Sequence, residues 1–528
     1  MTAELAEASI ATRHVLGAGQ RLSHSLLWEL QRAFYSNHGV DAWRKGHVPY
    51  RITNSPFIAD QYAQIVAAYL EDRRASLADP TRPIDIIELG AGCGQFSFHF
   101  LRRLGELTDR MPTPIRWRLV MTDLAERNLE FWRAHQQLAP YVRRGVLDFA
   151  RFAAGRDHDI TLLCSGETLT PPLTNGAVFL ANYFFDTLPI DVFAVESGQL
   201  RECRVTLTSS RPEPDLRDPD ALQRIDLRWH TVPTTADGYY EDPAFDRVLR
   251  EYQGLPDTTV QLPIEALRCC RLLRELAGGR MLLLTSDKGY VDPADLALQT
   301  RPELMLHGSS FSLCLDFHAL GRYFEGAGGA LLRPRHSPIL LLTVAMLLGD
   351  EPDGHPRTRH AFADTIDRFN PDDALAVDEA MVRHLDDATV DELLAVMRSR
   401  LADPWLVARC LSHMEKLVEH PSDQLRRDLT RILDEAWDRH YLLDAGDDFP
   451  FAAGITFYQM DDYERALTFY QRSLDLFGAS PHTHYNIAIC HHLQKRPREA
   501  ELHLRRTLEL MPDHTHATAL LRELTTPG

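Results

Sequence analysis

The chain has 528 residues, of which 44% are hydrophobic and 25% are charged. This length exceeds what one hydrophobic core usually serves and predicts two to four domains, and the composition excludes a largely disordered chain. The 57 Lys and Arg residues against 75 Asp and Glu residues leave a formal charge of −18, which disfavours nucleic acid and anionic membranes as partners.

The cysteines and the apolar runs indicate the cellular compartment of the protein. Eight cysteines are scattered without a CxxC pair, which favours reduced thiols and predicts no metal site. The first residues, MTAELAEASIATRH, lack the basic and apolar regions of a secretory signal, and the longest apolar run, 339–348, is too short to span a bilayer. We therefore expect a cytoplasmic protein without a membrane anchor.

The first two thirds of the chain have an α/β pattern. Apolar residues at helical spacing predict helices over 22–36 and 58–70, within an N-terminal helical region at 1–75. From residue 81, short β-rich runs alternate with helices, as in parallel strands joined by crossovers. The predicted strands are 84–89, 116–122, 145–149, 176–182 and 280–286, with an antiparallel closing pair after a helix at 316–324. An insertion at about 195–279 is expected to be helical, with a hairpin near RECRVTL and IDLRWHTV.

From residue 358 the pattern is helical and contains an internal repeat. At an offset of 34, small residues align with small residues: Gly454 with Ala488, and Ala466 with Ala500. These spacings resemble tetratricopeptide repeats (TPR), with units at 447–480 and 481–514, in which small residues let paired helices approach closely. A generic helical bundle with an accidental register is the alternative. Repeats of this kind usually hold a partner or another copy of the chain, so a homo-oligomer is one expectation.

The strongest chemical signal is the run Glu88-Leu89-Gly90-Ala91-Gly92-Cys93-Gly94, between an apolar strand and a helical segment. Glycines on alternate positions tolerate a sharp turn and a close ligand. A dinucleotide fingerprint would need glycine where Gln95 stands, and no Lys-Ser/Thr pair follows for a phosphate loop. The E-x-G-x-G-x-G pattern resembles the first motif of class I methyltransferases, which implies S-adenosyl-L-methionine as cofactor, held by Glu88, Gly90, Gly92 and Gly94. A glycine-rich turn without ligand is the alternative.

Acidic residues mark the next two strand ends. Asp123, followed by Leu124, ends the second predicted strand, where a carboxylate can accept two ribose hydroxyl hydrogen bonds. Asp148 and Phe149 end the third and would place a carboxylate near the adenine amino group and an aromatic or backbone contact beside the ring. Taken alone, an Asp that ends a strand is more often a helix cap, but its position one helix and one strand after the glycine run favours the ribose contact.

The fourth predicted strand ends in the run ANYFFDTLP, which in this fold lies under the reactive methyl group. Methyl transfer needs an acceptor placed in line and one proton removed. We predict that Asn182 orients an amine through its amide oxygen and contacts the cofactor. Tyr183 is expected to stack on or hydrogen-bond the acceptor, and Asp186 to pair with a cationic substrate or to take its proton. In the alternative, Phe184 and Phe185 belong to the core and Asp186 caps a helix.

Three runs together resemble MidA-like methyltransferases, the group that contains the mitochondrial complex I assembly arginine methyltransferase. They are ANYFFDTLPIDVF, ITNSPFIADQYA at 52–63 and LLLTSDKGY at 282–290, and the likeness spans roughly 50–345. The related pattern has an acidic residue after the asparagine, where this chain has Tyr183. That departure argues against arginine as the acceptor, because a guanidinium needs carboxylates to orient and deprotonate it.

Three other stretches are expected near the pocket. The segment Thr53-Asn54-Ser55-Pro56 closes over the methionine end, as the resemblance implies. In His307-Gly308-Ser309-Ser310-Phe311, the histidine is either a base or a structural residue. The stretch 41–53 (DAWRKGHVPYRIT) is either a rim of the pocket or a solvated loop.

We therefore expect an α/β protein with three parts. They are an N-terminal helical region at 1–75, a Rossmann-like seven-stranded class I methyltransferase sheet at 76–350, and an all-α TPR-like domain at 358–528. The predicted function is S-adenosylmethionine-dependent N-methylation of a protein or peptide, because remote binding by the repeats can orient the acceptor. A small-metabolite methyltransferase and a non-catalytic TPR scaffold are the alternatives.

Overall fold

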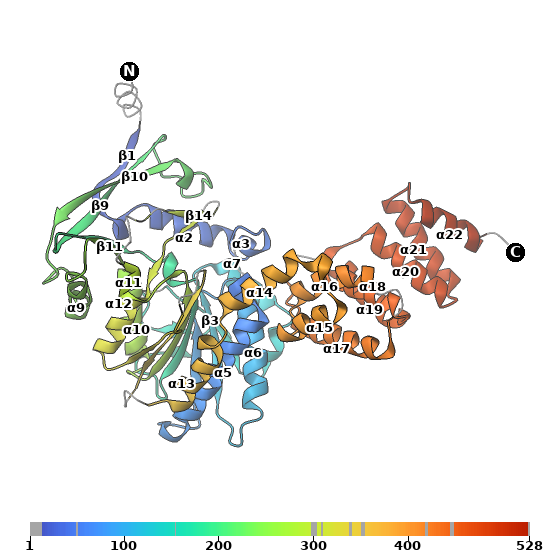
Figure 1. Ribbon diagram of the computed structural model, residues 1–528, viewed down its shortest axis with the longest axis horizontal. Helices are drawn as coiled ribbons and strands as arrows, with labels where there is room; N and C mark the ends of the chain where they lie inside the picture. Colours follow the sequence, from blue (N-terminus) through green and yellow to red (C-terminus); the bar gives the residue numbers. More distant parts are fainter. Residues whose placement is uncertain are drawn as a thin grey trace. The chain divides into compact units, whose positions relative to one another are not determined.

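The computed structural model describes residues 13–48, 51–153, 155–296, 302, 304–307, 310–336, 340–349, 354–417, 421–443 and 448–525. The chain forms two compact units, Met1–Asp373 and Ala374–Gly528, and Figure 1 shows the elements of each. The sheets lie in the first unit and the repeats in the second. The domain limits drawn from the sequence stay a prediction.

The first unit is built on a seven-stranded sheet with the order β17-β18-β12-β7-β2-β3-β4. The parallel strands are β2 (Ile84–Glu88), β3 (Trp117–Asp123), β4 (Leu147–Arg151), β7 (Ala177–Asn182) and β12 (Met281–Asp287). Two antiparallel strands, β18 (Leu342–Leu348) and β17 (Ala330–Leu332), close one edge. Every residue of β2 and β12 is buried, as in parallel sheets covered on both faces. The predicted seven-stranded α/β sheet is confirmed.

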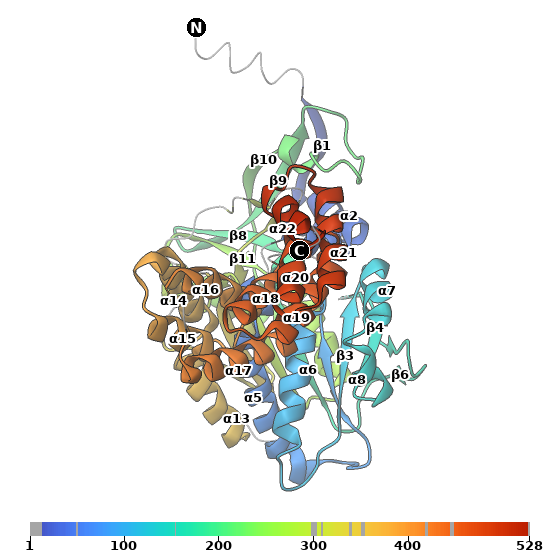
Figure 2. The same cartoon turned by 90° about the vertical axis from the view of Figure 1, so that its right-hand side faces the viewer.

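The strand order reverses beside β2, and a reversal of this kind leaves a crevice in which a ligand can bind. From β2 the chain runs outward through β3 to β4 and then returns to β7 on the other side of β2. The carboxyl ends of β2 and β7 therefore border a crevice, the place where open α/β sheets bind ligands. Helix α6 (Gln95–Thr108) follows β2 directly and packs beside α5 (Pro56–Arg73), which in turn contacts α13 (Pro356–Phe362), as Figures 1 and 2 show.

A second, five-stranded sheet has the order β1-β9-β8-β11, with β10 paired to β9. Its strands are β1 (His14–Arg21), β8 (Asp191–Glu196), β9 (Gln199–Ser209), β10 (Ile225–Pro233) and β11 (Thr258–Leu262). The predicted hairpin is confirmed as β9 and β10. The insertion holds α9 (Pro243–Tyr252) and α10 (Ile264–Leu276), as expected, and strands in addition. The N-terminal region is not wholly helical, because β1 completes this sheet through a partner far along the chain.

The other helices of the first unit include the two predicted before the sheet, found as α2 and α5. The remaining bounds are α2 (Leu27–His38), α3 (Asp41–Arg44), α4 (Arg51–Asn54), α7 (Glu126–Ala134), α8 (Ala139–Arg143), α11 (Pro293–Leu296) and α12 (Phe317–Gly326). Helix α14 (Pro371–Arg383) begins at the boundary between the units.

The second unit is helical and contains the predicted repeat. Its helices are α15 (Val390–Ser399), α16 (Pro404–Leu417), α17 (Asp423–Arg439), α18 (Phe449–Gln459), α19 (Tyr463–Phe477), α20 (Pro481–Leu493), α21 (Pro497–Leu510) and α22 (Thr515–Thr525). Close helix packing explains the small residues, since a Cβ on Gly454 would lie 2.5 Å from the Tyr470 ring. Ala466, Ala488 and Ala500 are fully buried. Within the described residues of both units, no helix is long and apolar enough to cross a membrane.

Candidate active site

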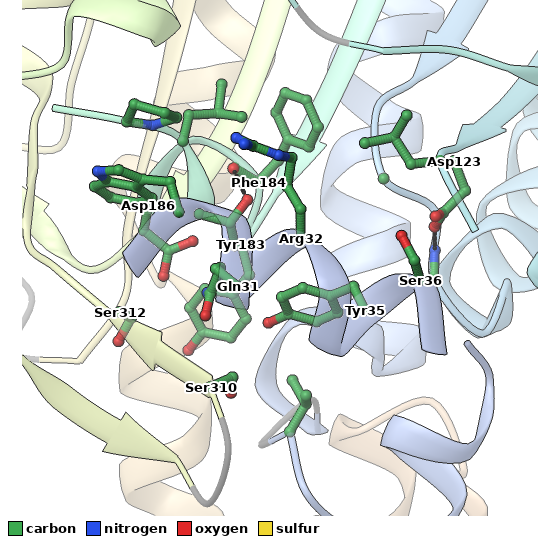
Figure 3. Close-up of a pocket in the computed structure, with 18 of the residues that line it drawn as sticks. Gln31, Arg32, Tyr35, Ser36, Asp123, Tyr183, Phe184, Asp186, Ser310 and Ser312 are labelled. Carbon is green, nitrogen blue, oxygen red and sulfur yellow. Dashed lines mark hydrogen bonds between the residues drawn. The ribbon is translucent and has the colours of Figure 1, made fainter. Parts of the chain in front are cut away.

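A cavity of about 850 Å³ lies at the carboxyl ends of the parallel strands in the first unit. Its walls come from the segments that follow β2, β3, β4 and β7, and from α2, which crosses it in Figure 3. Asp123 and Asp186 lie on opposite sides of that view. The volume is typical of a small-molecule or cofactor site.

The predicted glycine turn forms one wall of this cavity. Gly90, Gly92 and Gly94 have φ angles of 65°, 56° and 82°, a region that favours glycine. A Cβ on Gly90 would lie 2.9 Å from the Phe184 ring, and one on Gly92 would lie 2.5 Å from the Trp43 ring. The backbone conformation and the aromatic neighbours therefore both favour glycine at positions 90 and 92, which line the cavity, whereas Gly94 is not among the lining residues.

Glu88 ends β2 directly before this turn. Its side chain is buried and accepts a hydrogen bond from the Ser97 hydroxyl at the start of α6. Burial raises the pKa of Glu88 to about 7, with the hydrogen bond from Ser97 opposing the shift. Glu88 thus links the strand end to the first turn of α6 on the cavity wall.

Asp123 lies on the cavity wall and also braces the glycine turn. Its carboxylate accepts hydrogen bonds from Gly92 N at 3.1 Å, Ala125 N at 2.9 Å and Asn128 Nδ2 at 2.9 Å. Because a carboxylate offers about four acceptor positions, at most one is left for a ligand, where two ribose hydrogen bonds were predicted. Burial raises its pKa against these hydrogen bonds. The adjacent Leu124 is 37% exposed and lines the cavity.

Asp148 and Phe149 are not among the cavity-lining residues. Strand β4 continues to Arg151, two residues beyond its predicted end, so both residues lie inside the strand and are buried. The Asp148 carboxylate accepts hydrogen bonds from the backbone N–H groups of Phe149, Cys164 and Ser165. Burial alone would raise its pKa, but these hydrogen bonds lower it. Phe152 occupies the position after the strand and lines the cavity.

Asn182 ends β7, and the amide oxygen that was predicted to orient an amine already accepts one hydrogen bond. Its amide oxygen accepts a hydrogen bond from the Tyr62 hydroxyl at 2.7 Å, and Tyr62 also contacts Ser286 Oγ at 2.7 Å. The amide nitrogen is buried without a hydrogen-bond partner among the described residues. This hydrogen bond forms because helix α5 packs Tyr62 against the end of β7. The amide nitrogen is left to donate to a bound group.

Tyr183 follows Asn182 in a strained conformation. Its φ angle is 48°, and its N–H donates to Ser286 O at 2.9 Å. A non-glycine residue in this region carries a strain of about 1–2 kcal/mol, and such strain is frequent at functional sites. Burial, with the nearby carboxylates, raises the pKa of Tyr183, so the phenol on the cavity wall stays neutral.

Asp186 lines the cavity and does not cap a helix. The short 3-10 helix Phe185–Thr187 has Phe184 at its N-cap. Phe185 is fully buried in the core, while Phe184 lines the cavity. Asp186 is itself buried, and its N–H donates to Asp287 Oδ2 at 3.0 Å. Its Oδ1 has no hydrogen-bond partner in the described part of the chain.

The cavity-facing side of α2 was not identified from the sequence. Trp28, Arg32 and Tyr35 of this helix line the cavity, and Figure 3 shows Arg32 and Tyr35 on it. Gln31 exchanges two hydrogen bonds with the backbone of Phe311, at 2.6 and 3.0 Å, and so fixes strand β15 (Ser310–Ser312) against α2. Periodicity located the helix, but it could not show which face covers a ligand site.

The stretches 53–56 and 41–53 reach the cavity in part. Thr53 and Asn54 line it, and Asn54 Oδ1 accepts a hydrogen bond from Phe96 N at 3.2 Å. Ser55 instead caps α5 by accepting from Ile58 N. In the stretch 41–53, Trp43 lies over the glycine turn, whereas Tyr50 is outside the described residues.

His307 also lines the cavity, and its Nε2 lies 3.0 Å from Ser312 Oγ. Burial, with a smaller contribution from Lys288, lowers the pKa of His307. Gly308 and Ser309, which complete the predicted run, lie outside the described residues. The hydrogen bond ties His307 to the neighbouring strand β15.

Comparisons with known protein families found one match in each of the two units. Residues 65–292 match the model of a family described as "Putative S-adenosyl-L-methionine-dependent methyltransferase". Residues 451–513 match the tetratricopeptide repeat. The comparison with curated proteins gives no match.

Two solved structures resemble parts of the chain. One is described as a "likely methyl transferase" from Burkholderia thailandensis, bound to S-adenosyl-homocysteine. It has 14% sequence identity and a TM-score of 0.41, and the likeness covers 68% of this chain and 93% of that protein. The other is a thermophilic TPR protein from Thermus thermophilus, with 12% identity and a TM-score of 0.22, covering 32% of this chain and 89% of that protein.

Proposed function

The chain carries a methyltransferase domain that uses S-adenosylmethionine, and from this premise we propose that it methylates a nitrogen atom of a protein or peptide. The observation that carries the proposal is that the glycine turn shares one cavity with Asn182 and Asp186, each of which has a buried polar atom without a hydrogen-bond partner among the described residues. The tetratricopeptide match supports a protein or peptide acceptor, because stacked helical repeats form extended binding surfaces.

The cavity residues fit S-adenosylmethionine in size and chemistry. Gly90 and Gly92 present backbone to the cavity, Asp123 presents a carboxylate, and Leu124 is an exposed apolar contact. Once bound, the cofactor supplies a methyl group activated by the positive charge of its sulfonium. We propose that it is held by Glu88, Gly90, Gly92, Gly94, Asp123, Leu124 and Asn182, with Phe152 beside the adenine in place of Phe149.

The acceptor is proposed to lie beside the end of β7. There Asn182 Nδ2 donates to a polar atom of the acceptor or cofactor, and the neutral phenol of Tyr183 donates or stacks. Asp186 Oδ1 accepts the proton of the reacting nitrogen. Helix α2 covers the cavity, so its side chains exclude water from the reacting atoms.

A small metabolite is the second candidate acceptor, favoured by the α2 roof over the cavity. One assay separates the two candidates. Full-length protein is incubated with S-adenosylmethionine that carries a radioactive methyl group and with a cell extract, and the products are divided into protein and small-molecule fractions.

We expect label in the protein fraction, stable to mild base as N-methyl groups are. A heat-denatured sample and the Gly92→Arg variant are the controls, and both should leave the fraction unlabelled. Label confined to small molecules would replace the protein acceptor by a metabolite. Absence of label in both fractions would contradict methyl transfer.

A further inference from the structure

Within the described residues, three arginines that line the cavity have no ion-pair partner. They are Arg32 of α2, Arg151 at the end of β4 and Arg156 after that strand, and all three are exposed. This is so although Asp and Glu outnumber Lys and Arg in the chain by 75 to 57. Figure 3 shows the Arg32 side chain extending from α2 into the cavity, on the side of Phe184. Guanidinium groups without a counter-ion in a cavity indicate an anionic ligand.

The loop that carries Arg156 reaches the acceptor side of the cavity. Glu265, in the first turn of α10, joins this loop to the turn after β7. Its N–H donates to Pro189 O at 3.2 Å, and a Cβ on Gly155 would collide with its carboxylate. Asp186 belongs to the same turn as Pro189. Arg156, the residue after Gly155, therefore lies near the place proposed for the acceptor.

The acidic residues of the cavity do not neutralise these arginines. They are Glu29, Glu88, Asp123, Asp186 and Glu265. Burial raises the pKa of Glu88 and of Asp186 to about 7 and also raises that of Asp123, so the strand ends carry less than their full negative charge at neutral pH. Glu265 already pairs with Arg268 at 2.9 Å. Among the described lining residues, Glu29 is thus the one acidic group left to oppose three arginines, and Lys288 adds a further cation.

The pKa of Arg32 agrees with a site that lacks its anion. Burial, followed by the charge of Arg156, lowers this pKa, and the charges of Glu29 and Glu265 oppose the shift without cancelling it. A bound carboxylate would act in the opposite direction, because an opposite charge favours the charged form of a guanidinium.

We propose that Arg32 and Arg156 together bind an acidic side chain of the acceptor, so that the protein methylates nitrogens that have an Asp or Glu residue close by in the acceptor peptide. The proposal rests on the proposed function and names its substrate class. Each guanidinium can donate two parallel hydrogen bonds to one carboxylate. Both arginines determine specificity, because they hold the acceptor away from the reacting atoms. Arg151 precedes Phe152, on the side proposed for the adenine, and is not part of this site.

Two molecules in the cavity can supply a carboxylate, namely the acceptor and the methionine end of the cofactor. S-adenosylhomocysteine separates them, because it carries the carboxylate of the cofactor without any acceptor. In equilibrium dialysis, Arg32→Gln and Arg156→Gln should each bind it within about twofold of the wild type. A loss of about tenfold or more in either variant would assign that arginine to the cofactor and overturn the proposal.

The acceptor site is tested by fluorescence anisotropy with full-length protein saturated with S-adenosylhomocysteine. The probe is a labelled peptide with one lysine between two pairs of glutamates, and its twin has glutamine at the four glutamate positions. We expect the wild type to bind the acidic peptide about tenfold more tightly than the twin, the effect of two partly exposed charge pairs. The preference should fall as salt is added. The double variant Arg32→Gln/Arg156→Gln should bind both peptides equally.

Arg144→Gln is the matched control. Arg144 is also exposed and has no ion-pair partner in the described part of the chain, but it is not among the cavity-lining residues. This variant should keep the wild-type preference. Equal binding, or no binding, of the two peptides by the wild type would overturn the proposal. A preference retained in the double variant would also overturn it and would place the recognition of acidic residues elsewhere on the chain.

The radioactive assay separates this inference from the proposed function. Protein labelled in the extract is digested, and its methylated peptides are sequenced by mass spectrometry. We expect Asp or Glu to be enriched next to the methylated residues. Methylated sites without that enrichment would overturn the inference and leave the proposed function standing. Absence of transfer, with a peptide preference that the double variant loses, would overturn the proposed function, while the anion-binding site would stand.

Discussion

Gly92→Arg lowers the affinity for S-adenosylmethionine by more than about 100-fold, which corresponds to about 2.7 kcal/mol. The new side chain starts from a backbone with φ of 56°, and its Cβ alone would lie 2.5 Å from the Trp43 ring. The long side chain must then displace Trp43 or extend into the cavity that Gly92 and Trp43 both line. Equilibrium dialysis with radioactive S-adenosylmethionine measures the affinity directly.

Gly145→Arg is the matched control for backbone strain. Gly145 has φ of 72°, and a Cβ there would meet no described atom within 4 Å. Since it is not one of the cavity-lining residues, its substitution should leave the affinity within about twofold of wild type. Equal losses in both variants would mean that strain, and not the cofactor site, explains the effect. Retained affinity in Gly92→Arg would remove the glycine turn from the cofactor site.

Asp186→Ala lowers the rate of methyl transfer by about 10²–10⁴-fold, the usual contribution of a positioned base. Its carboxyl group is buried at the cavity, and its Oδ1 lacks a hydrogen-bond partner among the described residues, so alanine leaves the acceptor proton without a recipient. The affinity for S-adenosylhomocysteine should stay within about threefold of wild type, because the glycine turn and Asp123 are unchanged. The radioactive assay measures the rate of methyl transfer, and equilibrium dialysis measures the affinity for S-adenosylhomocysteine.

Asp237→Ala serves as the control for loss of an acidic side chain. Asp237 is exposed, pairs with Arg250 and is not among the cavity-lining residues. It should transfer methyl groups at the wild-type rate. A rate for Asp186→Ala within threefold of that control would exclude Asp186 as the base.

The features predicted from the sequence depend on local patterns. Short apolar runs located the five parallel strands to within two residues of their observed ends, because buried strands are continuous hydrophobic segments between turns. The glycine run predicted a turn because adjacent residues alone determine it. The TPR-like pairs were visible for the same reason, as the repeat period lies in the sequence itself.

The features that escaped prediction depend on distant partners. Asp287 meets Asp186 across 101 residues, and Tyr62 meets Asn182 across 120 residues. Neither pairing has a local signal in the sequence, so the hydrogen bond from Asp186 N to Asp287 and the hydrogen bond from Tyr62 to Asn182 appear only in the fold. An extension of β4 by two residues moved the strand end from Phe149 to Arg151 and so placed Phe152, instead of a residue next to Phe149, after the strand.

A crystal structure of the full-length protein with S-adenosylhomocysteine tests the central claim most directly. The account predicts one ligand in the cavity of the first unit, in contact with Gly90, Gly92, Asp123 and Leu124 and with its sulfur facing Asn182. A ligand bound elsewhere on the protein, with Asp123 and the glycine turn untouched, would contradict it.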